Sequence, residues 1–256
     1  MDKQVRNSSF QRKYRPQIFS GMHGLNYLTT EFESAIRQRR CDSIIFSGKN
    51  GHGKSTMAEI FLLRIFCENA EGLDACLKCG NCRFIIEDEG VPHVFRISGD
   101  QYTTEQFRYI ENRCLYSANI LPMKVNFIDD LDLAEENVLI KTIGLLNRYP
   151  DNLMLFTATN LAKIPPPVRQ RCKNFPLNKV DYQPLEEFIL DVCAKERILV
   201  KEKNAISLLI TLAHQTPRLI LTALELIKGE SNELSVASLN SPVIVSNLQQ
   251  LTGRFT

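Results

Sequence analysis

The chain of 256 residues has no apolar run long enough to span a bilayer and no basic segment followed by an apolar leader. These two absences predict a cytoplasmic protein that does not act on membranes. Internal repeats and low-complexity tracts are also missing. Because 44% of the residues are hydrophobic, neither a disordered nor a fibrous class fits. The length predicts one α/β core with a smaller second domain.

A strong net charge is missing as well, because 31 lysines and arginines oppose 29 acidic residues and leave a formal charge of +2. The total therefore indicates nothing about partners. Residues 1–40 are locally basic, with eight basic side chains against three acidic ones. Such an excess favours phosphate binding, but it is also typical of an ordinary solvated surface.

Short apolar runs do occur, and amphipathic stretches separate them, which is the pattern of a parallel sheet covered by helices. The predicted strands span residues 43–47, 93–98, 125–128, 153–158 and 174–177. Amphipathic helices are predicted at 104–117 and 135–146. The fold class is therefore α/β with a parallel five-stranded sheet.

The pattern changes after Lys179, where no further strand is predicted. Three helices of a separate small domain are predicted at residues 184–196, 203–214 and 217–228. The stretch from 229 to 256 is rich in Ser and Asn, and we expect a loose tail or one short helix there. The predicted organisation is a domain at 1–179, a helical domain at 180–230 and a tail at 231–256.

Residues 48–55 read GKNGHGKS, which matches the phosphate-binding pattern G-x4-G-K-[ST] directly after a predicted strand. Backbone N–H groups in this loop would surround the β-phosphate, Lys54 would bridge the β- and γ-phosphates, and Ser55 would hold Mg²⁺. A glycine-rich turn without a ligand is the alternative interpretation. The predicted nucleotide-binding residues of the loop are Gly48, Asn50, Gly51, His52, Gly53, Lys54, Ser55 and Thr56.

Two acidic residues end the predicted strand at 125–128, namely Asp129 and Asp130. A nucleotide hydrolase needs such an acid next to its phosphate loop: Asp129 would hold Mg²⁺ through water, and Asp130 would polarise the attacking water. Carboxylates commonly end strands at loops, so the pair gains weight only beside the phosphate loop.

Eight cysteines are present, and in a reducing compartment we expect metal binding rather than disulfides. Four of them follow the spacing C-x8-C-x2-C-x2-C: Cys67, Cys76, Cys79 and Cys82. Two overlapping C-x2-C steps aim sulfurs at one ion, which favours a structural zinc site over an iron–sulfur cluster or no metal. Four thiolates leave no open position for a catalytic water. The others are interpreted as ordinary small residues: Cys41, Cys114, Cys172 and Cys193.

Together these segments resemble the γ/τ subunits of the bacterial DNA polymerase III clamp loader, which are AAA+ ATPases, across roughly residues 11–230. The cysteine spacing and the phosphate loop both match the family pattern. The other matching segments are RKYRPQ at 12–17, FIDD at 127–130, LIKT at 139–142, KIPPPVRQRC at 163–172 and TPRLILTAL at 216–224.

The resemblance implies roles for residues that the sequence alone would leave as surface charges. Tyr14 and Arg15 match a segment near the adenine. Thr159 matches the sensor-1 position, which orients the attacking water or contacts the γ-phosphate. Arg171 matches an arginine finger that reaches the ATP of a neighbouring subunit, and Arg218 matches the sensor-2 arginine of the lid. A planar, always-charged donor suits the charge that develops on the γ-phosphoryl group.

The function that the resemblance implies is ATP-dependent loading of a sliding clamp onto primed DNA, with ATP, Mg²⁺ and Zn²⁺ as cofactors. The expected partners are other clamp-loader subunits in a hetero-oligomeric ring, the sliding clamp, and primed DNA bound through its backbone phosphates. Two alternatives remain open. One is a non-hydrolysing structural subunit that resembles the δ′ member, and the other is a generic P-loop ATPase with no role in replication.

The chain also departs from the family pattern. Asp130 stands where the family has Glu, which predicts slow hydrolysis, and Gln170 stands where the family has Ser. The family continues into a helical collar, for which the stretch after Gly229 is too short. We therefore expect a short or divergent form of the family that lacks this domain.

Overall fold

The computed structural model describes residues 9–37, 43–87, 94–115, 124–149 and 152–252. Its centre is a five-stranded parallel sheet in the order β2-β3-β4-β1-β5. The strands are β1 (Ser43–Ser47), β2 (Val94–Ser98), β3 (Val125–Asp129), β4 (Leu153–Ala158) and β5 (Cys172–Pro176). The predicted strands agree with these bounds to within two residues, except that residue 93 lies outside the described residues.

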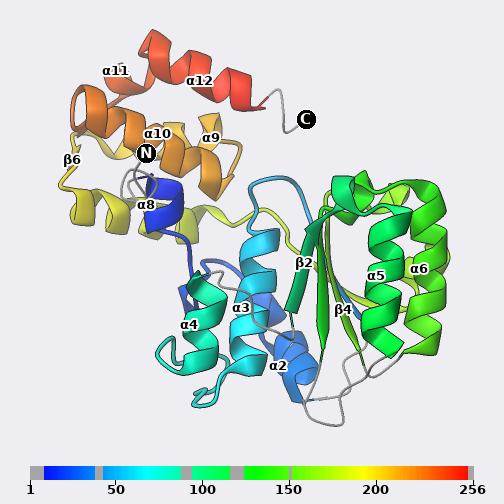
Figure 1. Cartoon of the computed structure of the whole chain (residues 1–256). Helices are drawn as coiled ribbons and strands as arrows, with labels where there is room; N and C mark the ends of the chain where they lie inside the picture. The colour runs from blue at the N-terminus through cyan, green and yellow to red at the C-terminus, as the bar shows by residue number, and fades with distance from the viewer. Residues whose placement is uncertain (1–8, 38–42, 88–93, 116–123, 150–151, 253–256) are drawn as a thin grey trace, which may run out of the picture.

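Both faces of the sheet are covered by helices, as Figure 1 shows. Alternation within β1 explains this arrangement, because Ile44 and Phe46 enter one core while Ile45 enters the other. The first core lies under α2 (Thr29–Arg37), α3 (Lys54–Phe66) and α4 (Gly80–Glu87). The second lies under α5 (Thr104–Leu115), α6 (Glu136–Arg148) and α7 (Pro166–Arg169). Short 3-10 turns lie at Phe19–Gly21, Asn26–Leu28, Gly99–Gln101, Leu131–Leu133 and Leu161–Lys163.

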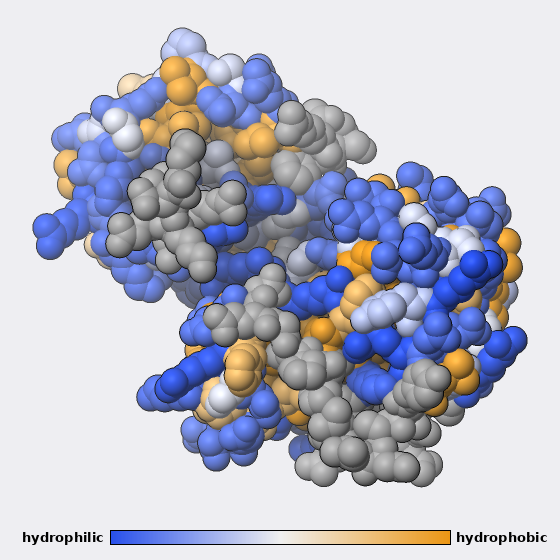
Figure 2. Space-filling model, viewed as in Figure 1, coloured by the Kyte–Doolittle hydropathy of each residue, from blue (hydrophilic) through white to orange (hydrophobic). Residues whose placement is uncertain are grey.

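A second lobe is built from the C-terminal helices, and the space-filling view shows both lobes with mainly hydrophilic surfaces (Figure 2). The predicted three helices are present as α8 (Tyr182–Glu196), α9 (Lys203–Leu212) and α10 (Pro217–Glu230). They share a third core of their own. No helix of the described residues combines the length and the apolar character needed to cross a membrane.

Two predictions for the region after residue 179 are wrong. Instead of no strands, the lobe contains a parallel pair, β6 (Leu199–Val200) with β7 (Glu233–Leu234). Instead of a loose tail or one short helix, residues 231–256 contain β7, α11 (Val236–Leu239) and α12 (Pro242–Thr252).

The Ser and Asn content of this region suggested a coil, but those residues cap and separate short helices. Ser235 begins α11 with a capping box that it shares with Ser238. The apolar residues Leu239, Ile244 and Leu248 complete the third core. Tertiary packing therefore outweighs the weak local signal.

The first described helix, α1 (Phe10–Lys13), packs against α10, although more than 200 residues separate the two helices in the chain. Phe10 is buried in the third core together with residues of α8, α9 and α10. Figure 1 shows α1 beside the C-terminal helices. The N-terminal segment thus crosses from the second lobe to the first, and the domain boundaries drawn from the sequence stay a prediction.

Candidate functional site

The phosphate loop connects β1 to α3, and glycine is required where the loop touches the second lobe. Gly51 has a φ of +80°, and a Cβ at this position would lie 2.5 Å from Cγ2 of Thr216. Gly53, with a φ of +89°, is the left-handed residue that begins α3. Backbone conformations of this kind are open to glycine at little steric cost. The loop therefore lies directly against the start of α10.

Lys54 is the first residue of α3 and is only 5% exposed. Its ammonium donates to Thr159 Oγ1 at 2.9 Å, to Asn50 Oδ1 at 3.3 Å and to the Lys49 carbonyl at 3.4 Å. Burial lowers the pKa of Lys54, while the nearby carboxylates of Asp130 and Asp132 oppose this shift. Among the described residues this buried ammonium has no carboxylate as a hydrogen-bond partner, so it is suited to attract phosphate oxygens.

His52 is also 5% exposed, although it lies in the loop. Burial lowers its pKa and the lysines Lys54, Lys179 and Lys49 add to this effect, while a hydrogen bond with the Leu177 backbone opposes it. Its Nδ1 has no hydrogen-bond partner among the described residues. The side chain is thus part of the packing beneath the loop rather than an additional positive charge.

The acidic edge of the site is held by hydroxyl groups. Ser55 Oγ donates to the Asp129 carboxylate, with oxygens at 2.9 and 3.0 Å. Thr157, buried in β4, donates its hydroxyl to Asp129 and accepts the backbone N–H of Asp130 at 2.7 Å. Ser55 and Asp129 therefore form a pair of oxygen donors of the kind that Mg²⁺ prefers.

Asp130 follows β3 in a left-handed conformation with a φ of +52°. Burial raises its pKa, the Asp129 carboxylate raises it further, and Lys54 opposes both. Gly99 allows this turn, because a Cβ there would lie 2.0 Å from the Asp130 carbonyl oxygen. The carboxylate therefore lies at the phosphate loop in a backbone conformation that asparagine and aspartate tolerate better than most residues.

These elements surround one cavity of about 540 Å³ between the two lobes. Three separate segments line it: the N-terminal segment with Tyr14 and Arg15, the phosphate loop with the strand-end acids, and α10 with Arg218. The volume and the mixture of cationic and carboxylate groups suit a nucleotide with a divalent cation.

Most of the residues predicted from the sequence meet at this cavity. Its lining includes Tyr14, Arg15, Asn50, Gly51, His52, Gly53, Lys54, Ser55, Thr56, Asp129, Asp130 and Arg218. Thr159 joins them through its hydrogen bond to Lys54, and it also donates to Asn50 Oδ1 at 2.9 Å. Gly48 lies behind the loop, where a Cβ would meet the Leu177 carbonyl oxygen at 2.4 Å.

Arg171 is not among the residues that line the cavity. Its side chain is exposed, donates to Asn147 Oδ1 and donates to the Pro167 carbonyl at 2.9 Å. In this conformation Arg171 therefore cannot contact a nucleotide bound at the phosphate loop of its own chain.

Sequence reasoning missed several residues that hold the site together. Asp132 accepts the backbone N–H groups of Thr159 at 2.9 Å and of Asn160 at 3.0 Å, which fixes the end of β4. Thr157 bridges two strands, and its signal was a hydroxyl within an otherwise apolar buried strand. Gln11 contacts Arg218, and no local pattern in the sequence marks it.

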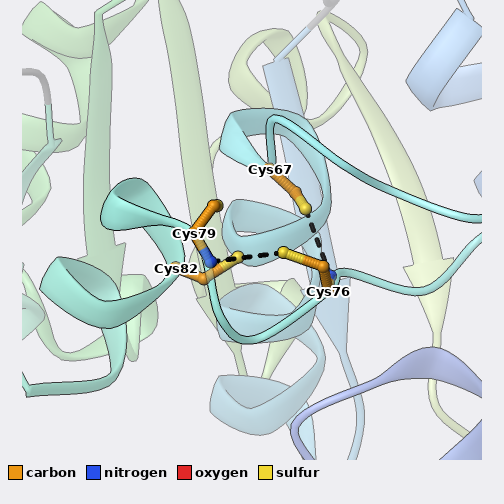
Figure 3. A group of neighbouring side chains, drawn as sticks. All are labelled: Cys67, Cys76, Cys79 and Cys82. Atoms are coloured by element: carbon orange, nitrogen blue, oxygen red, sulfur yellow. Dashed lines mark hydrogen bonds between the residues drawn. The ribbon is translucent and has the colours of Figure 1, made fainter.

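The cysteine cluster lies at the other end of α3. Cys67 follows the last residue of α3, Cys82 lies in α4, and Figure 3 shows all four side chains turned toward one another. Their sulfur atoms lie within 4.8 Å of one another. A Zn²⁺ ion with four thiolates at about 2.3 Å needs sulfur separations of about 3.8 Å, so a small contraction would complete the site.

Backbone donors favour the thiolate form of Cys76, whereas burial raises the pKa of the Cys82 thiol. The N–H of Cys76 donates to Cys67 Sγ at 3.1 Å, and that of Cys79 donates to Cys76 Sγ at 3.4 Å. Donation from Lys78 and Cys79 lowers the pKa of the Cys76 thiol to about 6. Such N–H···S bonds are what a metal-bound thiolate requires in its second shell of contacts. Of the other cysteines, Cys114 and Cys193 are buried, Cys172 is half-buried, and Cys41 lies outside the described residues.

A phosphate loop on a parallel sheet, closed by a small helical lobe, is the architecture of AAA+ proteins. A solved structure shows a similar fold: a variant of RuvB from Thermotoga maritima matches with a TM-score of 0.62 and 14% identity, over 93% of this chain and 72% of that chain. At this level of identity the likeness concerns the fold alone.

The family follows from sequence comparison. The chain belongs to the family described as DNA polymerase III, delta subunit, whose model matches residues 25–181. Curated relatives include subunit tau of Bacillus subtilis, 26% identical over 75% of this chain. Subunit gamma/tau of Mycoplasma genitalium is 26% identical over 96%, and subunit tau of Escherichia coli is 26% identical over 77%. The chain spans 34%, 41% and 31% of the lengths of these three relatives.

Proposed function

We propose that the chain is an ATP-dependent clamp-loader subunit of a bacterial DNA polymerase III, which helps to load the sliding clamp onto primed DNA in the cytoplasm. One observation carries the ATP-binding part: the buried Lys54 ammonium and the Ser55–Asp129 pair lie at one cavity. Family membership supports the replication part.

In this proposal the cationic residues of the cavity bind phosphate, and the carboxylates bind Mg²⁺ or act on water. Lys54 binds the phosphates, and Ser55 and Asp129 hold Mg²⁺, which when bound neutralises phosphate charge. Asp130 polarises the attacking water, and Thr159, already bonded to Lys54, orients it. Arg218, on the opposite wall, contacts the γ-phosphate.

The base of the nucleotide would lie at the N-terminal segment. Tyr14 and Arg15 line the cavity there, and both are anchored. The Tyr14 hydroxyl donates to Glu196 at 2.6 Å, and Arg15 pairs with Glu59 at 2.9 Å. We propose that the remaining apolar faces of this segment pack on the adenine.

Arg171 acts on a neighbouring subunit in this proposal. Its exposed position, away from the cavity of its own chain, supports a role in trans as an arginine finger. Assembly into a hetero-oligomeric ring would therefore be needed for full ATPase activity, and contact with DNA would go through backbone phosphates.

The cysteine cluster would hold a structural Zn²⁺. The donor set fits, because four sulfurs converge, and the thiolates leave no position for a catalytic water. The ion would fasten the end of α3 to α4, remote from the phosphates that bind at the start of α3.

The Lys54→Ala variant tests the ATP-binding part. Removal of the buried ammonium should weaken ATP binding at least about a hundred-fold, measured by isothermal titration calorimetry with Mg²⁺ present. Lys203→Ala removes an exposed ammonium from the second lobe and should bind ATP as the unmodified chain does. Absence of any nucleotide binding by the unmodified chain would contradict the proposal.

The replication part needs a separate experiment. The tagged chain should co-purify with clamp-loader subunits of its host, and the mixture should load a sliding clamp onto primed DNA when ATP is added. If the chain binds ATP but co-purifies with none of these subunits, it is a generic P-loop ATPase.

A non-hydrolysing structural subunit is the second candidate, and Asp130 favours it. This carboxylate is one methylene shorter than a glutamate and therefore reaches less far toward an attacking water. Such a subunit would bind ATP without turnover and would serve its neighbour through Arg171.

A further inference from the structure

The side chain of Arg218 is exposed, yet it is tied to a residue more than 200 positions earlier in the chain. Its Nε donates to Oε1 of Gln11 at 3.1 Å. Gln11 lies in α1, and both side chains line the same cavity. This is the one hydrogen bond that the described residues give the guanidinium, so its two terminal NH₂ groups stay available for a phosphate.

The other end of the Gln11 carboxamide is fixed as well. Its Nε2 donates to Oγ1 of Thr222 at 2.8 Å. The Thr222 hydroxyl uses its own hydrogen to donate to the Arg218 carbonyl at 3.0 Å, one turn back along α10. The carboxamide therefore spans one turn of α10 and holds the side chain of Arg218 against it.

The orientation of the carboxamide follows from chemistry alone. An arginine can only donate, so the group that faces Arg218 must be the carbonyl oxygen of Gln11. The Thr222 hydroxyl donates its only hydrogen to the Arg218 carbonyl, so toward Gln11 its oxygen acts as an acceptor for the carboxamide NH₂ group. A flipped amide would break both hydrogen bonds, so only one orientation of the Gln11 carboxamide fits its two partners.

The backbone that carries Arg218 also lies close to the phosphate loop. A Cβ at Gly51 would lie 3.3 Å from Cβ of Arg218 and 2.5 Å from Cγ2 of Thr216, so the phosphate loop touches the first turn of α10. The phosphate loop thus fixes the position of Cβ of Arg218, and the hydrogen bond to Gln11 fixes the position of its Nε.

We propose that Gln11 is a positioning residue that holds Arg218 ready for the γ-phosphate and so sets the preference of the site for ATP over ADP. This rests on the proposed function, because it deepens the role of Arg218 at that site. Pre-ordering a flexible arginine before binding reduces the conformational entropy that is lost when it engages a ligand. Because Arg218 meets only the γ-phosphate, the advantage applies to ATP and not to ADP.

Gln11→Met tests the proposal, because methionine keeps the length of the side chain and loses both hydrogen bonds. It should lower the affinity for ATP about five-fold and leave the affinity for ADP within about two-fold, by calorimetric titration of the full chain with Mg²⁺. Gln17→Met, an exposed glutamine of the same segment outside the cavity lining, should leave both affinities unchanged. Equal melting temperatures will show that each variant is folded.

A double-mutant cycle separates positioning from packing. If Gln11 acts through Arg218, Gln11→Met should add no further loss of ATP affinity to Arg218→Ala, since the two residues work as one unit. Additive losses, or an unchanged ATP/ADP ratio in Gln11→Met, would overturn the inference while ATP binding by the unmodified chain stands. Failure of the unmodified chain to bind any nucleotide would instead overturn the proposed function.

Discussion

In the proposed function, the rate of ATP hydrolysis would depend on Asp130. Asp130 follows β3 in a left-handed conformation and lines the same cavity as the phosphate loop, but its side chain is one methylene shorter than that of a glutamate. The same backbone makes aspartate the more tolerated of the two acids, because left-handed conformations favour short polar side chains. At position 130 a glutamate would therefore reach farther toward the substrate, whereas an aspartate fits the left-handed backbone better.

We predict that Asp130→Glu raises ATP turnover roughly ten-fold in the assembled complex, because the longer carboxylate approaches the attacking water. The variant should also melt at a lower temperature, since a left-handed glutamate costs about 1 kcal/mol. Phosphate release assays and thermal unfolding measure the two effects. Asp100→Glu, an exposed change beside Gly99, should affect neither. Turnover that is absent in both forms would support the non-hydrolysing subunit.

Among single residues, the site residues that could be predicted are those that belong to a local sequence pattern. Lys54, Ser55 and Asp129 meet as expected, because the loop pattern and the strand-end acids are local signals. Gln11 and Asp132 could not be predicted, since their contacts join segments that only the folded chain brings together. Arg171 was assigned through the resemblance, and its role stays a prediction.

At the scale of single elements, the segment between α3 and α4 depends on contacts other than a regular hydrogen-bond ladder. Residues 67–79 contain no helix or strand in the structure, and their anchors are few. Arg64 Nε donates to the Gly72 carbonyl at 2.8 Å, and Ser20 bonds the Asp74 carboxylate through its N–H and its hydroxyl. Cys82 is fully buried in the first core. A metal ion held by the four thiolates would add a further tie between the end of α3 and α4.

We predict that the purified chain holds about one Zn²⁺ and that Cys79→Ser removes most of it, as measured by plasma emission spectrometry. The melting temperature should fall with the metal, because the loop loses its tie to α4. Cys172→Ser alters a half-buried cysteine of β5 and should keep the zinc. Iron together with visible absorption would indicate an iron–sulfur cluster instead, and no metal at all would contradict both.

The elements themselves were predicted best where both faces are buried. β1 and β4 were predicted with their observed bounds, because two covering layers bury every residue of these strands and most of the buried residues are apolar. β6 and β7 are two residues long, which is too short for any period to show. The helices α11 and α12 were missed because their burial comes from contacts with α9 and α10, not from a strong local pattern.

At the scale of the whole molecule, Glu196 joins the N-terminal segment to the second lobe. Its carboxylate is 6% exposed and accepts from Lys13, Tyr14 and Lys228. Burial alone would raise the pKa of this group, but these three donors together outweigh it and hold the pKa at about 2. A single buried anion thus ties α1, α8 and α10 together on one side of the cavity.

We predict that Glu196→Gln destabilises the chain by about 2 kcal/mol at pH 7, because two lysines lose their anionic partner. Since the folded-state pKa lies below the ordinary value of 4.5, this stabilisation is complete above that pH and is lost as the pH falls toward 2. Urea unfolding at pH 7 and pH 3 should show the difference between the two proteins shrinking. Glu202→Gln, at an exposed glutamate, should show no such change. A constant difference across this range would contradict the assignment.

The strand order has a consequence for synthesis on the ribosome. Ile44 of β1 pairs with Leu155 of β4 and with Lys173 of β5, so both neighbours of this strand are translated more than a hundred residues later. At elongation rates of about 5–20 residues per second, roughly 6–25 s pass between the synthesis of β1 and the synthesis of the strands that pair with it. During that interval the apolar run SIIFS is exposed on the nascent chain. Binding by a chaperone at the exit tunnel would protect this run, and a strain depleted of such chaperones should accumulate the protein in inclusion bodies.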